Sequence, residues 1–397
     1  MVKEEKKAPK LRFNGYTNDW ERKKLGNVAK ITPGGTPSKN ISNYWYPKEI
    51  PWLSSGEINK EIIFSTDDMI SKEGFNNSSA KWIKQDSVLI ALAGQGKTRG
   101  KVAINRIPLT TNQSIAGIEP SNEVYYKFLY HQLTKDYLKL RLVSSGDGSR
   151  GGLNKKLLND YAVNLSSIDE QHKLGILLSR IDNTLQLHER KCEELTLIKK
   201  ALLQKLFPKK DEIKPEVRYK NFSDAWEQRK LREVVNFLDT LRKPLEGAKR
   251  VKGPYPYYGA SGIVDYVDGY LFDEELILLS EDGANITERN YPVCFLASGK
   301  YWVNNHAHVL KIKEDNDNNF ICNSLERKDY TKYNTGMAMP KLNKETCKGI
   351  PIMCPNYDEQ KKIGNYFRKF DTLITLHQHK LEKLKQLKKF LLQNMFI

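Results

Sequence analysis

The sequence has no long hydrophobic run. Its longest apolar stretch is residues 88–93, Val-Leu-Ile-Ala-Leu-Ala, far short of the roughly 20 residues that span a bilayer. The first seven residues are mostly charged, so we expect no secretory signal peptide. Cysteine is scarce, because only five occur and no two have CxxC spacing. These absences favour a cytoplasmic protein with reduced thiols over a membrane protein, a disulfide framework or a zinc site.

Catalytic signatures are missing as well. The chain has no GxSxG, no HExxH, no Asp/Asn-Pro-Pro-aromatic motif of amino-methyltransferases and no convincing glycine fingerprint for S-adenosylmethionine. His306 and His308 have no third ligand at a suitable spacing, and His377 and His379 would point to different sides of a helix. We therefore predict no catalytic residue, no metal and no cofactor bound by this chain.

The charge balance is the first positive clue. Lys and Arg number 65 against 48 Asp and Glu, which gives a net charge of +17 over 397 residues. A polyanion is the natural partner of such a chain, and nucleic acid is the foremost candidate. The alternative is a soluble protein that is merely rich in lysine. The length suits two or three domains.

The most informative feature is an internal repeat. Segment 12–25 recurs at 218–231, with Arg, an aromatic residue, Trp-Glu and Lys-Leu at matching places and an offset of 206. Two triplets, Leu-Asn-Lys and Asp-Glu-Gln, recur at an offset of 189, namely 153–155 with 342–344 and 169–171 with 358–360. Each half therefore consists of an opening motif, a divergent domain and a similar terminal segment.

The terminal segments are predicted to be long helices. Ser167-x-x-Glu170 has the form of a capping box, and Asn356-x-x-Glu359 is a looser counterpart. Apolar residues then recur in alternating steps of four and three, and the only two exceptions in each copy, His and Lys, occupy equivalent places. The first seam is Leu174, Leu178, Ile181, Leu185, His188, Cys192, Leu195, Lys199, Leu202 and Leu206; the second is Ile363, Phe367, Phe370, Ile374, His377, Leu381, Leu384, Lys388, Leu391 and Met395.

Each predicted helix has about 33 residues, and Pro208 ends the first. The simplest way to bury both seams is to pack the two helices against each other, antiparallel, with a pseudo-twofold axis. We interpret His188 and His377 as polar residues that fix the register rather than as metal ligands or pH switches.

The divergent segments 25–165 and 231–354 have the pattern of mixed α/β domains with short strands and a helix at 124–142. Residues Ala91–Thr98 satisfy a relaxed form of the phosphate-binding P-loop and follow a strand. A true P-loop needs a helix directly afterwards, whereas residues 99–104 favour a second strand. A hairpin tip is the preferred interpretation, and a P-loop NTPase is an alternative function.

Taken together, the sequence resembles the specificity subunits of type I restriction–modification systems. The resemblance is carried by residues 9–26, their copy at 218–231, and both Asp-Glu-Gln triplets with Ile181-Asp182 and Phe370-Asp371 behind them. It implies an α+β fold: two pseudo-symmetric mixed α/β target-recognition domains joined by two long antiparallel coiled-coil helices. The first recognition domain is expected at 1–165 and the first spacer helix at 166–208. The linker and the second recognition domain are expected at 209–354, and the second spacer helix at 355–397.

The resemblance also implies a function. Such a subunit reads a bipartite double-stranded DNA site, one half per domain, and directs two methyltransferase (M) subunits and endonuclease/translocase (R) subunits to it. Adenine methylation and ATP-dependent cleavage, with their S-adenosylmethionine, ATP and Mg, belong to those partners. A purely structural coiled-coil adaptor is a further alternative.

Base contacts cannot be carried over from the family, since the recognition domains diverge. Polar residues near glycines are the candidates, because Arg and Lys pair with guanine edges and Asn and Gln with adenine. In the first domain these are Gln95, Lys97, Thr98, Arg99, Asn112, Gln113, Ser149 and Arg150. In the second domain they are Asn285, Asn304, Asn305, His306 and Lys341.

Overall fold

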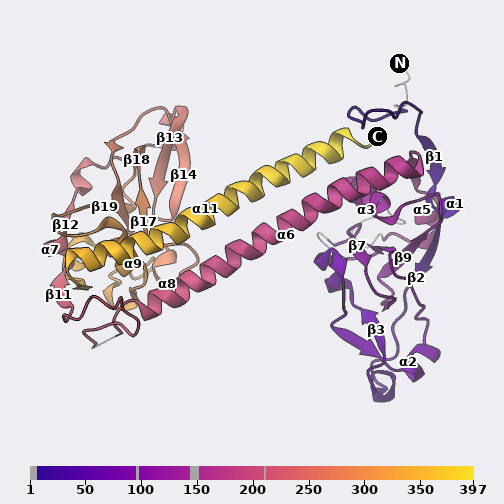
Figure 1. Cartoon of the computed structure of the whole chain (residues 1–397), viewed down its shortest axis with the longest axis horizontal. Helices are drawn as coiled ribbons and strands as arrows, with labels where there is room; N and C mark the ends of the chain where they lie inside the picture. Colours follow the sequence, from indigo (N-terminus) through magenta and orange to yellow (C-terminus); the bar gives the residue numbers. More distant parts are fainter. Residues whose placement is uncertain (1–6, 95–97, 144–151, 210–211) are drawn as a thin grey trace. The chain divides into compact units, whose positions relative to one another are not determined.

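The computed structural model describes residues 7–94, 98–143, 152–209 and 212–397. The chain divides into two compact units, a first unit of residues 1–188 with 380–397 and a second unit of residues 189–379. Each unit contains one α/β domain and a part of both long helices, α6 (Ile168–Lys205) and α11 (Tyr357–Asn394) (Figure 1). Both helices have 38 residues, slightly more than predicted.

The first unit is built on a five-stranded sheet of order β2-β9-β6-β7-β4. Its central strand β6 is wholly buried, because Val88 and Ile90 face one apolar cluster while Leu89 and Ala91 face another. This two-sided burial explains the continuous apolar run in the sequence. The strands are β2 (Ala29–Pro33), β9 (Ile115–Pro120), β6 (Val88–Ala91), β7 (Val102–Asn105) and β4 (Ile62–Ile63).

Smaller elements complete the first unit. A three-stranded sheet combines β5 (Asp68–Ile70), β3 (Ile50–Leu53) and β8 (Thr110–Thr111). The helix predicted at 124–142 is two helices, α3 (Tyr126–Lys135) and α4 (Tyr137–Leu142), separated at Asp136. Figure 1 shows α3 beside the first turns of α6, with which it shares an apolar cluster. The remaining helices are α1 (Leu25–Val28), α2 (Lys72–Asn76) and α5 (Lys155–Asp160).

The second unit repeats this plan with different sheets. One has the order β12 (Val235–Phe237), β19 (Ala307–Ile312), β16 (Leu276–Ser280), β17 (Cys294–Ala297). The other has the order β14 (Gly262–Val267), β13 (Lys252–Gly259), β18 (Lys300–Val303), β15 (Phe272–Asp273). The helices are α7 (Leu231–Val234), α8 (Asn285–Glu288), α9 (Asn318–Glu326) and α10 (Lys344–Lys348). Strand β16 is again buried on both faces.

The sequence repeat is also a structural repeat. In the first unit β1 (Glu21–Lys24) pairs antiparallel with β10 (Ala162–Leu165), and in the second unit β11 (Glu227–Lys230) pairs in the same way with β20 (Pro351–Cys354). The first residue after β1, Leu25, donates its amide hydrogen to the Tyr161 carbonyl, and Leu231 does the same to Ile350, both at 2.8 Å. Each opening motif therefore closes its own domain against the strand that leads into the long helix.

The tryptophan of each opening motif sits in an equivalent aromatic cluster. Trp20 lies 5.5 Å from Phe128 and 6.0 Å from Phe396 between ring centroids. Trp226 lies 5.5 Å from Phe320 and 5.9 Å from Phe207. Both indoles are almost completely buried, at 6% and 2% exposed. The Trp-Glu match between the halves therefore reflects a shared core.

Only one of the two hydrogen bonds of each predicted capping box is present, the one that the cap side chain accepts. The Glu170 amide donates to the Ser167 hydroxyl at 3.4 Å, and the Glu359 amide donates to the Asn356 side chain at 3.0 Å. The two glutamate carboxylates, however, do not turn back to the caps. Each accepts a two-pronged hydrogen bond from an arginine of the opening motif, Arg12 or Arg218, at 2.7–2.8 Å.

The predicted seams are the packed faces of both helices. In the first unit Leu174, Leu178, Ile181 and Leu185 of α6 are buried in one cluster with Leu391 of α11 and with Met395, the residue after α11, and Leu384 packs against it. In the second unit Ile363 and Phe367 of α11 are buried with Leu206 of the segment after α6. The start of one helix thus meets the end of the other in each unit, which is the antiparallel packing expected. His188, Leu195, Phe370, Ile374 and His377 are half-buried.

The P-loop alternative conflicts with the structure. Strands β6 and β7 pair antiparallel, and residues 98–100 form a turn that leads directly into β7. No helix begins in this described segment, so the phosphate-binding helix terminus that a P-loop requires is missing there. The hairpin interpretation is confirmed.

Candidate nucleic-acid interface

Four loops of the second unit converge beyond the end of β16. The Glu281 amide donates to the His306 carbonyl at 2.9 Å, and the Leu342 amide donates to the Glu281 carbonyl at 2.7 Å. The Ser280 hydroxyl donates to the Ala260 carbonyl at 2.6 Å. Residues 259–262, 280–285, 304–306 and 334–341 therefore form one loop surface, which we name the second polar edge.

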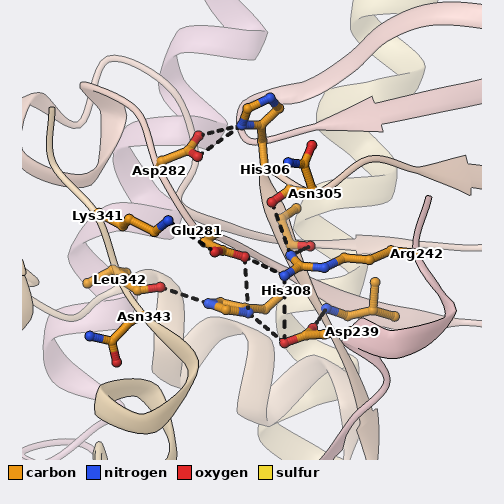
Figure 2. A network of polar contacts seen from close by, with 12 residues as sticks. Asp239, Arg242, Glu281, Asp282, Asn305, His306, His308, Lys341, Leu342 and Asn343 are labelled. Atoms are coloured by element: carbon orange, nitrogen blue, oxygen red, sulfur yellow. Dashed lines mark hydrogen bonds and ion pairs between the residues drawn. The ribbon is translucent and has the colours of Figure 1, made fainter. Parts of the chain in front are cut away.

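A buried histidine holds this surface to the sheet. His308, only 1% exposed, has Nδ1 2.9 Å from Asp239 and Nε2 2.8 Å from the Leu342 carbonyl oxygen. Burial favours a raised pKa for Asp239, but hydrogen bonds from His308 and the Val309 amide outweigh it, and the pKa is lowered. Figure 2 shows His308 bridging the two groups.

An arginine–glutamate pair ties two more loops to this histidine. Arg242 lies 2.5 Å from the Glu281 carboxylate and donates to the carbonyl oxygens of Asn305 and Ala307 at 3.2 and 2.8 Å. The Lys341 ammonium lies 3.5 Å from the same carboxylate (Figure 2). Glu281 thus joins Arg242 and Lys341, and the second polar edge is held by charged groups at its base.

His306 is the imidazole that this edge presents to solvent. Its Nδ1 lies 2.9 Å from both carboxylate oxygens of Asp282, and half of its side chain is exposed (Figure 2). The carboxylate orients the ring from one side. Asn305 and Lys341 are exposed beside it, while Asn304 is buried and its side-chain oxygen accepts from the His306 amide at 2.8 Å. The edge therefore offers an amide, an imidazole and an ammonium to a ligand.

The predicted DNA contact at Asn285 needs correction. Asn285 is only 4% exposed, and its amide nitrogen donates to the Ser280 hydroxyl at 2.9 Å and to the Pro292 carbonyl at 3.2 Å. Its side chain holds the start of α8 to the sheet and does not reach the surface. A glycine-flanked Asn has the sequence pattern of an exposed loop, but here tertiary packing buries it.

The first unit has an equivalent surface at the end of β6. The Leu153 amide donates to the Leu92 carbonyl at 2.9 Å, as Leu342 does to Glu281, and the Leu92 amide donates to the Ser114 carbonyl at 2.8 Å. Thr98, Arg99 and Asn112 are half-buried there and Gln113 is exposed, with Gln113 contacting Thr36. We name these four nominated residues the first polar edge. Gln95, Lys97, Ser149 and Arg150 lie outside the described residues.

Sequence reasoning missed the groups that support the second polar edge. Asp239 lies 69 residues from His308, and Glu281 is in turn far from Arg242 and Lys341 along the chain. The available signal is the acidic pair Glu281-Asp282 directly after β16, whose first four residues are all apolar. Among the residues that the structure describes, no group of three or more His, Cys, Asp or Glu could hold a metal ion. Within the same residues no helix is both long and apolar enough to cross a membrane.

The chain belongs to the type I restriction modification DNA specificity domain family, whose model matches residues 17–197 and 223–386. The two matches correspond to the two halves of the repeat. The resemblance seen in the sequence is thereby confirmed, together with the fold class.

Individual relatives agree with this assignment. A putative type I restriction enzyme specificity subunit of Haemophilus influenzae, S.HindORF215P, is 39% identical over 137 residues, 34% of this chain and 35% of that protein. The EcoR124I/EcoR124II specificity subunit of Escherichia coli is 29% identical over 43% of each chain. The aligned parts of this chain therefore cover less than half the length of each of these two relatives. The MjaIX specificity subunit of Methanocaldococcus jannaschii is 24% identical over 94% of this chain and 92% of its own.

The fold has a solved counterpart. The crystal structure of a type I restriction–modification S subunit from M. genitalium matches with a TM-score of 0.75 over 98% of this chain and 99% of that one. The sequence identity is 16%, so this likeness concerns the fold alone.

Proposed function

We propose that the chain reads a bipartite double-stranded DNA site in the cytoplasm, with one half-site for each recognition domain. The observation that carries this proposal is the repeated position of a polar loop surface, at the end of β6 in the first unit and of β16 in the second. The surrounding fold is shared, whereas the exposed side chains differ. Such a pair of surfaces suits two different half-sites.

The side chains on the two edges can make base-specific contacts. Thr98, Arg99 and Gln113 offer a hydroxyl, a guanidinium and an amide in the first unit. Asn305, His306 and Lys341 offer an amide, an imidazole and an ammonium in the second. Asn and Gln pair with adenine, whereas Arg and Lys pair with the guanine edge in the major groove. The net charge of +17 adds attraction to phosphates that is independent of sequence.

The same proposal includes two methyltransferase subunits as partners. Support comes from exposed apolar residues at repeat-matched positions on the long helices: Leu187 with Leu376, 50% and 49% exposed, and Ile198 with Leu387, 49% and 44% exposed. The first unit holds Leu187 and Leu387, and the second holds the matching Leu376 and Ile198. Two equivalent apolar sets suit two copies of one partner.

Endonuclease/translocase subunits would join for restriction, and the catalytic chemistry would lie in the partners. S-adenosylmethionine, ATP and Mg are assigned to those subunits in this proposal, and none to the present chain. The adaptor alternative differs in one respect, since a purely structural chain would not determine which DNA sequence is modified.

Mapping of methylated adenines tests the proposal. The chain is expressed with its methyltransferase subunit in a host that lacks other adenine methylation, and a culture with the methyltransferase alone is the control. We expect one bipartite sequence to be methylated only when the chain is present. Methylation that does not depend on the chain, or that follows no sequence, would support the adaptor and contradict DNA reading.

A further inference from the structure

The loop between Asn334 and Lys341 carries the most exposed apolar residue of the second unit. Met337 is fully exposed and Met339 is 60% exposed. Single apolar residues are common on protein surfaces, but two within three residues at one loop tip are not explained by core packing.

The loop is closed on itself by local hydrogen bonds. The Asn334 side-chain oxygen accepts from the amides of Gly336 and Lys341 at 2.9 and 2.8 Å. The Thr335 amide donates to the Lys341 carbonyl at 2.8 Å. A Cβ atom on Gly336 would lie 1.8 Å from the Met339 carbonyl oxygen, so only glycine fits there. The methionines therefore project from a tight turn.

The base of the loop is fixed to the buried network. The Gly283 amide donates to the Pro340 carbonyl at 3.0 Å, and the Leu342 carbonyl accepts from buried His308 at 2.8 Å. The loop is fixed at its base and closed by the hydrogen bonds between its two ends, so its tip is held in one conformation. Such preorganisation lowers the entropy that is lost when the tip binds a partner.

Two residues of the second polar edge favour DNA as that partner. Lys341 ends the loop and offers an exposed ammonium, and the half-exposed His306 belongs to the same polar edge (Figure 2). Proteins that distort DNA insert apolar side chains, methionine among them, between base steps, with basic and amide groups around the wedge. The second polar edge combines a strongly exposed Met337 with an ammonium, an imidazole and an amide.

We infer that Met337 is a wedge that inserts between neighbouring base pairs of the half-site read by the second domain. The inference rests on the proposed DNA-reading function and adds a distortion of the DNA to it. The repeat restricts the wedge to the second domain. At the offset of 189, Gly148 and Arg150 of the first half align with Met337 and Met339. Segment 144–152 contains no large apolar residue, so the wedge belongs to one half-site only.

The test uses the assembled complex with its methyltransferase subunit and the duplex defined by methylation mapping. The fluorescent base 2-aminopurine is placed at successive positions of each half-site, except at the methylated adenine, whose own movement would add a signal. We expect fluorescence to rise at one step of the second domain's half-site with the wild-type chain. Met337→Ala should abolish that rise and weaken binding about tenfold. Met337→Leu, which keeps an apolar side chain, should retain both.

Phe64→Ala is the matched control. Phe64 is 69% exposed in the first unit and follows β4, which pairs with β7 at the Asn105 end, away from the 98–100 turn. This variant should change neither binding nor fluorescence.

Three results would overturn the inference in distinguishable ways. Unchanged fluorescence and affinity in Met337→Ala, with methylation still at the mapped site, would refute the wedge and leave the DNA-reading proposal standing. Weaker association of Met337→Ala with the methyltransferase subunit in the absence of DNA would make the tip a protein contact. A wild-type complex without a specific methylation site would refute the proposed function and the wedge together.

Discussion

The ammonium group of Lys388 lies 2.6 Å from the carboxylate of Asp182, where α11 packs on α6 in the first unit. The second unit repeats the contact in the opposite sense, with Lys199 of α6 2.6 Å from Asp371 of α11. The lysines that interrupt both apolar seams thus each have an acidic partner on the other helix. Their burial differs, because Asp182 is 8% exposed and Asp371 is 49% exposed.

This difference predicts unequal costs for the two lysines. Lys388→Ala leaves Asp182 buried without its partner and should destabilise the first unit by about 3 kcal/mol. Lys199→Ala leaves an exposed carboxylate and should cost less than about 1 kcal/mol. Urea unfolding of the full chain measures both, and equal costs would contradict the account of the two seams.

Loss of the arginine of the first opening motif should destabilise the first unit about as much as loss of Lys388. Arg12 holds Glu170, whose side chain is only 1% exposed, through two hydrogen bonds. Arg12→Ala should therefore cost about 3 kcal/mol. Lys24→Ala breaks an exposed pair with Asp160 and is the control, with an expected cost below about 0.5 kcal/mol. A loss in Arg12→Ala no larger than in the control would show that the bond does not secure the domain to α6.

Acidity should weaken the first unit through His131. Burial holds the pKa of His131 well below its ordinary value, and the charges of Lys388 and Lys127 lower it further. The unfolded chain therefore takes up the proton first, and stability that is complete above about pH 6.5 is lost as the pH falls below it. Asp182, 3.9 Å away, has a pKa that burial raises, so it acts oppositely, over a window that extends upward from its ordinary pKa of about 4.

His131→Asn provides the comparison for this pH effect. Asn323 occupies the matching position of α9 when the helices are aligned on Phe128 and Phe320. Hydrogen exchange of the α3 amides at pH 7 and pH 5 measures local opening. After the observed rates are corrected for the intrinsic exchange rate at each pH, we expect weaker protection at pH 5 in the wild type and a smaller change in the variant. Identical pH responses would exclude His131 as the cause.

The two asparagines of the second polar edge should have separate effects. Asn285→Ala removes buried hydrogen bonds and should cost about 1–3 kcal/mol, with the methylated sequence unchanged. Asn305→Ala should leave stability within about 0.5 kcal/mol and alter DNA reading, since its side chain is exposed. Unfolding and methylation mapping of both variants check this, and a changed sequence preference in Asn285→Ala alone would reverse the assignment.

Part of this structure could be predicted from sequence because its signals are periodic or repeated. Leu174, Leu178 and their counterparts Ile363 and Phe367 recur at helical spacing, and two matching copies strengthened the interpretation. The partner of Glu170 could not be predicted in the same way. A capping box is a local pattern, whereas Arg12 lies 158 residues away and competes successfully for the carboxylate.

The candidate site was predictable in composition but not in detail. The loops around Asn305, His306 and Lys341 were identified by their polar residues and glycines. Which of those residues faces solvent depends on packing, and for this reason the loop pattern predicts a surface position for Asn285 although its side chain is buried. The supporting network joins Asp239 and Arg242, which lie close together in the chain, to the distant Glu281 and His308, and it has no local sequence pattern.

Exchange of one recognition domain tests the central claim most directly. Residues 25–165 are replaced by the corresponding segment of a relative whose methylated site is known, and the variant is expressed with the methyltransferase subunit. Methylated adenines are then mapped across the host genome and compared with the wild-type pattern. We predict that one half-site changes to that of the relative while the other half-site stays the same. A change in both halves, or in neither, would contradict the account in which each unit reads its own half of the DNA site.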